Sequence, residues 1–187
     1  MIQIRPAQPD DVEVAAVLLY SAYTHTQVTY PLPEEQRQGW IKNLQRYFHQ
    51  KDNRFSYQNV YVAASDSQVV GLVLGFGGQD EDRLNAAVGP WLEREAQDDE
   101  WYVDALAVFT NLSRRGIGTR LMGTAESQAR QGHYPKIALN VAQENTSALG
   151  LYAHLGYAIT QQTVLYERPH VRMVKLLDGE ESATARS

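Results

Sequence analysis

The segment from 101 to 132 changes from the pattern of a strand to that of a helix across a short glycine-containing loop. Its first part, WYVDALAVF at 101–109, is rich in β-branched and aromatic residues and predicts a strand. Its last part places four apolar residues on one helical stripe, Ile117, Leu121, Ala125 and Ala129. A strand that runs directly into a helix is typical of an α/β fold.

The residues before this segment predict two helices and three strands. IQIRPA at the start has the composition of a short strand, and Asp10 with Glu13 forms a capping signature before an amphipathic helix. A second helix is expected to begin near Pro33 and to end near residue 50. VYVAA at 60–64 and VVGLVLGF at 69–76 are expected to pair as an antiparallel hairpin.

The C-terminal part predicts three more strands and one helix. KIALNV at 136–141 indicates a strand, and the following helix is expected to begin at Asn145 or the next residue and to stop at Gly156. YAITQQTVLYE and HVRMVKLL read as two final strands. We expect one domain over residues 1–177 and a disordered tail at 178–187.

Composition excludes some kinds of chemistry. The 187-residue chain has no Cys, which rules out disulfides, cysteine zinc sites and a thiol nucleophile. Its net charge of −5 argues against nucleic acid or an anionic membrane as the main partner and favours a cationic one. No secretory signal and no apolar run of membrane-spanning length is visible, so we expect a cytoplasmic protein.

The segment 78–100 is strongly acidic, with eight acidic residues against two Arg. Pro90 prevents one continuous helix there, and we interpret the segment as a surface insertion. Such a run is usually a solvated face. The alternative is a lid that attracts a cationic substrate, because the run precedes the central strand.

Gly116 and Gly118 lie between a strand and the first turn of a helix. Glycines allow a ligand to approach the backbone closely, and free N–H groups at a helix N-terminus favour an anion such as a pyrophosphate. The alternative is that the glycines only permit a tight turn. A Walker loop is excluded because no Gly-Lys-Ser/Thr follows.

A second informative stretch, LNVAQENTSALGLYAHLGY, places Asn145 at a helix start and Tyr152 two turns later. Both side chains can therefore line one groove. Taken alone, a tyrosine at position 152 would more often be a core residue with a satisfied hydroxyl.

Together these stretches resemble the GNAT superfamily of acetyl-CoA-dependent N-acetyltransferases, most specifically from Trp101 to Tyr157. The resemblance implies a mixed, largely antiparallel sheet of six or seven strands with helices on both faces. It implies that acetyl-CoA is the co-substrate. Ser113 departs from the family pattern, which has Arg or Gln at the entrance of the phosphate loop. The residues expected to contact acetyl-CoA are Val108, Arg114, Arg115, Gly116, Ile117, Gly118, Thr119, Asn145 and Tyr152.

The resemblance also implies roles in catalysis. The strand ending at Val108 should diverge from its neighbour and expose a backbone N–H to the thioester carbonyl. Tyr152 should protonate the departing thiolate, and the acetyl group should pass directly to a primary amine. Such an amine must lose a proton first. Asp104 is the first candidate base because it should share a strand face with Val108, and Glu100 is the second. Asp104 could instead be a structural partner of a backbone amide or of an Arg.

The acceptor is expected to be a cationic amine, such as a polyamine, an aminoglycoside-like molecule, or a peptide or protein amine. No metal is expected, because no His pair has metal-ligand spacing. His170 could line an acceptor pocket, but a surface position is the more common role for such a residue. A homodimer is possible. Two rival functions remain: a non-catalytic acyl-CoA sensor, and a nucleotide-binding module that uses the glycine loop for phosphate.

Overall fold

The computed structural model describes residues 2–24, 39–66 and 68–177. None of the helices in these ranges is long and apolar enough to cross a membrane. The strands are β1 (Ile2–Pro6), β2 (Val60–Ser65), β3 (Gln68–Gly77), β4 (Glu100–Val108), β5 (Lys136–Ala142), β6 (Ala158–Leu165) and β7 (Arg168–Leu176). The helices are α1 (Val12–Thr24), α2 (Trp40–His49), α3 (Glu81–Ala86), α4 (Ile117–Gln131) and α5 (Thr146–His154).

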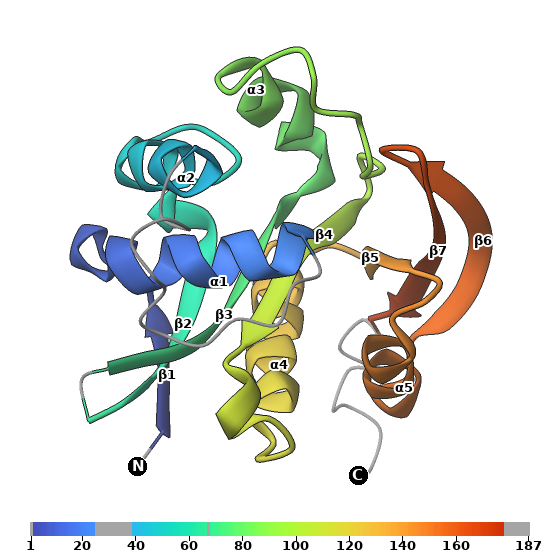
Figure 1. Cartoon of the computed structure of the whole chain (residues 1–187). Helices are drawn as coiled ribbons and strands as arrows, with labels where there is room; N and C mark the ends of the chain where they lie inside the picture. Colours follow the sequence, from blue (N-terminus) through green and yellow to red (C-terminus); the bar gives the residue numbers. More distant parts are fainter. Residues whose placement is uncertain (1, 25–38, 67, 178–187) are drawn as a thin grey trace, which may run out of the picture.

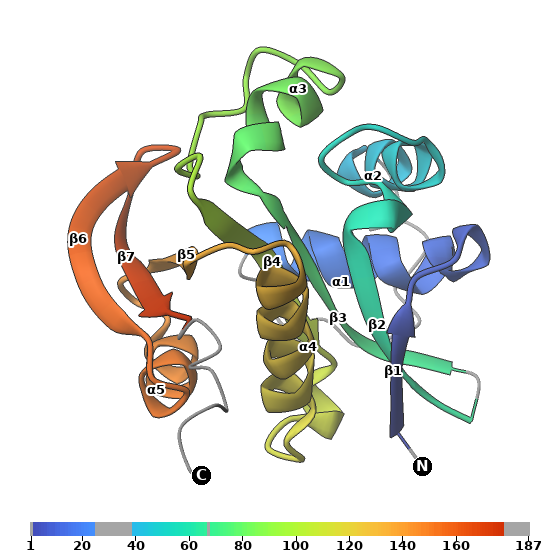
Figure 2. The same cartoon turned by 180° about the vertical axis from the view of Figure 1, so that it is seen from behind.

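The seven strands form one sheet in the order β1-β2-β3-β4-β5-β7-β6. All neighbouring pairs are antiparallel except β4 and β5, which are parallel. Helix α1 crosses one face of the sheet and α4 covers the opposite face, as the two views from front and back show (Figures 1 and 2). The expected mixed, largely antiparallel sheet with helices on both faces is therefore confirmed.

Each face of the sheet has its own apolar core. Helices α1 and α2 pack on one face through residues such as Leu19, Ile41 and Phe48. Helix α4 packs on the other face, where Leu121 and Ala125 are buried. The predicted stripe of α4 lies wholly in this second core, whereas α2 contributes Ile41, Leu44 and Phe48 to the first and leaves Trp40 exposed.

The start of α1 differs in detail from the prediction. The capping carboxylate is that of Asp11, which accepts a hydrogen bond from the Gln8 N–H at 2.8 Å and forms an ion pair with Arg5, also at 2.8 Å. Asp10 and Glu13 do not make this cap. The predicted start of α2 near Pro33 and the tail at 178–187 lie outside the described residues, whereas α2 ends at His49 as expected.

Strands β4 and β5 separate after three residue pairs. Their pairing runs from Glu100 opposite Lys136 to Tyr102 opposite Ala138 and then stops, while β5 stays paired with β7 as far as Ala142. The sheet therefore opens into a V between β4 and β5. This confirms the predicted divergence of the strand that ends at Val108.

A β-bulge in β4 changes which side chains share a face. Leu74 pairs with Ala105 and the next residue of β3 pairs with Val103, so Asp104 is an extra residue on β4. Asp104 points toward the α1 face, where it accepts a hydrogen bond from Tyr23. Val108 packs on the α4 face. The expectation that Asp104 and Val108 share a face is wrong, because the bulge shifts the alternation by one residue.

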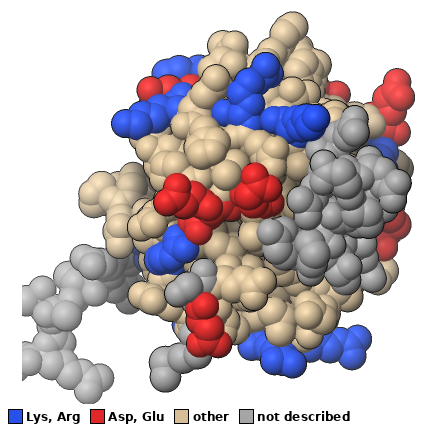
Figure 3. All heavy atoms as spheres, turned by 60° about the vertical axis from the view of Figure 1, so that its left-hand side comes forward, with Lys and Arg blue, Asp and Glu red and all other residues tan. Residues whose placement is uncertain are grey.

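The acidic segment 78–100 folds over the upper end of β3 and β4, and it contains α3 (Figure 1). Most of its carboxylates are already paired. Arg94 bonds both Asp82, at 2.7 Å, and Asp98, and Lys136 lies 2.9 Å from Asp99. The face that carries α1 and α2 has charges of both signs, with Lys and Arg above and below a group of Asp and Glu (Figure 3).

Candidate active site

A groove of about 1020 Å³ runs along the diverging end of β4 and the N-terminus of α4. Eight of the nine residues predicted to contact acetyl-CoA line it, and Arg115 is the exception. Ser113 lines it as well, so its departure from the family pattern leaves it in the expected place. The phosphate loop, the end of β4 and the start of α5 thus form one continuous surface.

The phosphate loop presents unpaired backbone donors to this groove. Gly116 is the N-cap of α4 and has a left-handed backbone, with φ of 73°, and Arg114 has φ of 61°. The first backbone bond of the helix is from the Arg120 N–H to the Gly116 carbonyl, at 3.1 Å. The N–H groups of the first turn therefore have no acceptor within the helix and are available to an anion.

Asn145 lies opposite this loop, at the start of α5. Its Oδ1 atom accepts a hydrogen bond from the Ala148 N–H at 3.1 Å, which caps the helix. The side-chain amide group makes no bond to the described part of the chain and lines the groove. Asn145 can therefore hold α5 in place and donate a hydrogen bond to a ligand at the same time.

The V between β4 and β5 exposes two backbone N–H groups. The Phe109 N–H donates to the Val70 carbonyl on β3 at 3.1 Å. N–H groups alternate in direction along a strand, so those of Leu106 and Val108 point away from β3, toward the space that β5 has left. The strand that ends at Val108 thus exposes backbone N–H groups where the resemblance leads us to expect one, and their role as donors to a thioester oxygen stays a prediction.

A second cavity, of about 280 Å³, opens on the other side of the V. Its deep part contains Arg54, Glu95 and Asp104, whose side chains are 1%, 9% and 2% exposed. Five residues line both cavities, Ala22, Leu106, Asn145, Ala148 and Tyr152. The groove and the second cavity therefore meet at this shared wall.

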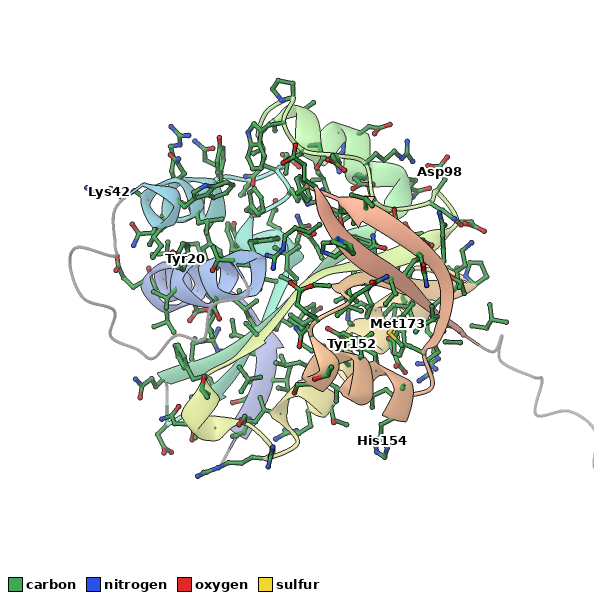
Figure 4. All side chains as sticks on the ribbon, turned by 45° about the vertical axis from the view of Figure 1, so that its right-hand side comes forward. Tyr20, Lys42, Asp98, Tyr152, His154 and Met173 are labelled. Carbon is green, nitrogen blue, oxygen red and sulfur yellow. The ribbon has the colours of Figure 1, made fainter. Side chains whose placement is uncertain are left out.

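Tyr152 lies in the shared wall. It projects from α5 toward the central strands, whereas His154 points away from them (Figure 4). Burial raises the pKa of the Tyr152 phenol well above its usual range. Its hydroxyl makes no hydrogen bond with the described residues, and its ring packs edge-on against Tyr157 at 5.9 Å. Tyr152 is thus a buried, protonated phenol with a free hydroxyl at the junction.

Asp104, the first candidate base, is held by Arg54. The Arg54 Nε and Nη2 atoms donate to the two carboxylate oxygens of Asp104 at 2.9 and 2.5 Å, and the Tyr23 hydroxyl donates at 2.6 Å. Arg54 also contacts Glu81 and Glu95, at 3.1 and 2.6 Å. Asp104 lines the second cavity. Its two oxygens are nevertheless both bonded by Arg54, so it is a structural partner of an Arg, which was the alternative to its role as base.

Glu95 faces the same cavity, and both of its carboxylate oxygens accept hydrogen bonds, including one from the Tyr166 hydroxyl to Oε1 at 3.4 Å. Its Oε1 atom accepts from Arg54, and its Oε2 atom accepts from the Tyr102 hydroxyl at 2.6 Å. The Tyr102 hydroxyl in turn accepts from Asn140 at 3.0 Å. Burial raises the pKa of Glu95, and the nearby Arg54 partly opposes this. A carboxylate with a raised pKa beside a cavity is suited to accept a proton near neutral pH.

Glu100, the second candidate base, lines neither cavity. It is fully buried, bonds Arg172 with both oxygens, and accepts from the Gln97 N–H at 2.9 Å. It therefore holds the start of β4. His170 does line the second cavity, as the sequence suggests it could. No cluster of three or more potential metal ligands occurs in the parts of the chain that the structure describes.

Arg54 and Glu95 are functional candidates that the sequence does not predict. Arg54 lies in an irregular segment between α2 and β2, and no motif marks it. Glu95 is one of eight acidic residues in a run, and nothing in its spacing distinguishes it from its neighbours. The acidic run itself was the only available signal, and it pointed to the correct segment.

Comparison with known proteins places the fold. The model of the Acetyltransferase (GNAT) family matches residues 19–157. An N-acetyltransferase from Staphylococcus aureus Mu50 is 25% identical, with a TM-score of 0.76 over 92% of this chain and 100% of that one. The ribosomal-protein-S18-alanine N-acetyltransferase of Escherichia coli is 15% identical, with a TM-score of 0.60 over 97% and 99%.

A further similar structure contains a bound ligand. The putative streptothricin acetyltransferase from Bacillus anthracis, in complex with acetyl coenzyme A, is 18% identical, with a TM-score of 0.50 over 64% of this chain and 62% of that one. A comparison with curated protein sequences gives no significant match. The family model covers most of the chain, and the fold and the phosphate loop agree with it. The chain belongs to the GNAT family of acetyltransferases.

Proposed function

We propose that this enzyme transfers the acetyl group of acetyl-CoA directly to a primary amine. The observation that carries the proposal is the junction of two cavities at Tyr152. One cavity has the phosphate loop at its wall, and the other has buried carboxylates. A donor and an acceptor bound in them would meet beside one proton donor and two backbone N–H groups.

The groove suits acetyl-CoA, which supplies an acetyl group activated as a thioester. The N–H groups of residues 117–119 and the side chain of Arg114 would hold its phosphates. The amide group of Asn145 would hold the pantetheine arm. The N–H groups of Leu106 and Val108 would donate to the thioester carbonyl and stabilise negative charge on its oxygen.

Tyr152 would supply the proton for the departing thiolate. A phenol whose pKa is raised by burial stays protonated throughout the neutral and mildly alkaline range. The donor is therefore in its acid form whenever the reaction takes place. Its hydroxyl has no competing acceptor among the described residues, so it is free to turn toward sulfur.

Glu95 is our choice for the group that takes the proton from the amine. An alkylammonium has a pKa of about 10.4 and must be deprotonated before its nitrogen can attack. Glu95 is preferred over Asp104 because Arg54 binds both oxygens of Asp104, and over Glu100 because Glu100 lines neither cavity. Water can bridge Glu95 and the amine.

The alternative function is a non-catalytic acyl-CoA sensor. A sensor requires the groove but not a second cavity with buried carboxylates, so the cavity beside Glu95 favours an enzyme.

A thiol-release assay with a panel of primary amines separates these functions. We expect amine-dependent release of coenzyme A and a product that carries the acetyl group, as mass spectrometry would show. Binding of acetyl-CoA with no release above the hydrolysis background for any amine would favour the sensor.

A further inference from the structure

The second cavity, which we call the acceptor pocket, has a charged floor and an aromatic mouth. The floor is the buried group around Arg54 and Glu95 described above. The mouth is formed by Trp40, Trp91 and Tyr166, which are 47%, 46% and 42% exposed. These three residues come from α2, the acidic segment and the turn between β6 and β7, so separate parts of the chain bring aromatic side chains to one opening.

Exposed apolar side chains are concentrated at the mouth of this pocket. Six large apolar side chains are exposed among the described residues, and three of them line this one pocket. Trp40 and Trp91 pack edge to face with their ring centres 5.1 Å apart, which fixes both rings at the opening. Exposed aromatic surface gathered at a cavity is suited to bind a flat apolar group.

The floor carries excess negative charge. Glu81, Glu95 and Asp104 all contact Arg54, so three carboxylates surround one guanidinium and leave two negative charges when all four groups are ionised. Arg94 approaches Glu81 only at 4.0 Å and from the exposed side. One ammonium group at the floor would therefore be electrostatically favoured.

The mouth offers no comparable place for a second ammonium group. Among the described residues that line the mouth, Arg168 carries the charge, which is positive, and it forms an ion pair with Glu144. Glu93 does not line the pocket, and it accepts a hydrogen bond from the Tyr166 N–H at 3.3 Å. The cavity volume of about 280 Å³ is also small for an aminoglycoside.

We infer that the acceptor is a compact monoamine with an aromatic or similarly flat apolar group, its amino group toward Glu95 and its flat group against Trp40 and Trp91. This inference rests on the proposed function and narrows its acceptor class. It disfavours polyamines and aminoglycosides, which need several anionic contacts.

The test compares three amines as acetyl acceptors: 2-phenylethylamine, n-butylamine, which lacks the ring, and spermidine, which has more than one charge. We expect kcat/KM for 2-phenylethylamine to exceed that of each other amine by roughly tenfold. Trp91→Ala should lower kcat/KM for 2-phenylethylamine by roughly 2- to 10-fold through KM, the range of one aromatic contact. Trp91→Phe should retain most of the wild-type kcat/KM for 2-phenylethylamine. The kcat/KM for n-butylamine should change by less than about twofold in Trp91→Ala.

Leu176→Ala is the matched control, because Leu176 is exposed, apolar and outside the pocket. Leu176→Ala should leave kcat/KM unchanged for both 2-phenylethylamine and n-butylamine. None of the variants should change the affinity for acetyl-CoA. Spermidine as the best acceptor, or equal rates for 2-phenylethylamine in Trp91→Ala and wild type, would overturn the inference and leave amine acetylation standing. No acetylation of any amine would overturn the proposed function together with this inference.

Discussion

Tyr152 is the residue on which the chemical proposal depends most. Tyr152→Phe keeps the ring and removes only the proton, so kcat should fall by about 10² or more, a range typical of general acid catalysis. Acetyl-CoA affinity and melting temperature should change little, because the hydroxyl bonds none of the described residues. Steady-state kinetics measures kcat, and calorimetry measures the acetyl-CoA affinity and the melting temperature. A core tyrosine would give the opposite result, with lower stability and full turnover.

Glu95 predicts a pH dependence. Burial raises its pKa, so its carboxylate takes up a proton at a higher pH than a free glutamate, whose pKa is about 4.3. As pH falls through the raised value, kcat/KM should fall because the base is lost. Glu95→Gln should remove this acid limb and lower kcat/KM by about 10², and Glu95→Asp should keep the limb. If Asp104→Asn removes the limb and Glu95→Gln keeps it, Asp104 is the base.

At this scale the sequence predicted the residues of the groove better than those of the acceptor pocket. Gly116 marks the start of α4, and Asn145 and Tyr152 lie at the start of α5 and two turns along it, so the local sequence around each helix start is sufficient to place them. Arg54 and Glu95 meet only because distant segments pack together, at 2.6 Å. Contacts of this kind leave no periodic signal in the sequence.

The junction between β4 and α4 is the element that prepares the groove. Gly116→Val places a β-branched residue at φ of 73° and a new side chain in open space beside the groove. We expect coenzyme A affinity to fall by about tenfold, close to 1.4 kcal/mol. Gly123→Ala, on the exposed side of α4, is the control and should raise stability by roughly 0.5–1 kcal/mol without changing affinity. If calorimetry finds that folded Gly116→Val binds coenzyme A with wild-type affinity, the loop is only a turn and does not contribute to coenzyme A binding.

Arg54 joins the acidic segment to β4, since it bonds Glu81, Glu95 and Asp104. Arg54→Met leaves these buried carboxylates without their partner and should lower the free energy of unfolding by roughly 3–5 kcal/mol. Arg83→Met removes an exposed pair with Asp80 and should cost less than about 1 kcal/mol. Chemical denaturation compares them. Equal stability of the two variants would show that the buried cluster does not hold the segment.

The elements themselves were largely predictable, and the bulge in β4 was not. Strand and helix periodicity depends on side chains within one segment, so it marks β1 to β7 and the inner faces of α2 and α4. The extra residue at Asp104 depends on how β3 pairs with β4, and no glycine or proline in β4 signals it. The prediction that Asp104 and Val108 share a strand face was wrong because this bulge was not predicted.

For the molecule as a whole, the divergence of β4 from β5 allows two cavities to meet in one domain. The groove and the acceptor pocket share five wall residues, so both substrates would be bound when the acetyl group moves. The chain has no Cys, which excludes a thiol as carrier of the acetyl group. These observations support direct transfer within a complex that holds both substrates.

The pattern of initial rates tests this claim directly, with acetyl-CoA and the best acceptor amine varied together. Direct transfer predicts double-reciprocal lines that intersect, because the reaction requires both substrates to be bound at once. Parallel lines, together with acetyl label retained on the protein after incubation with acetyl-CoA alone, would indicate a covalent acyl-enzyme and contradict the account.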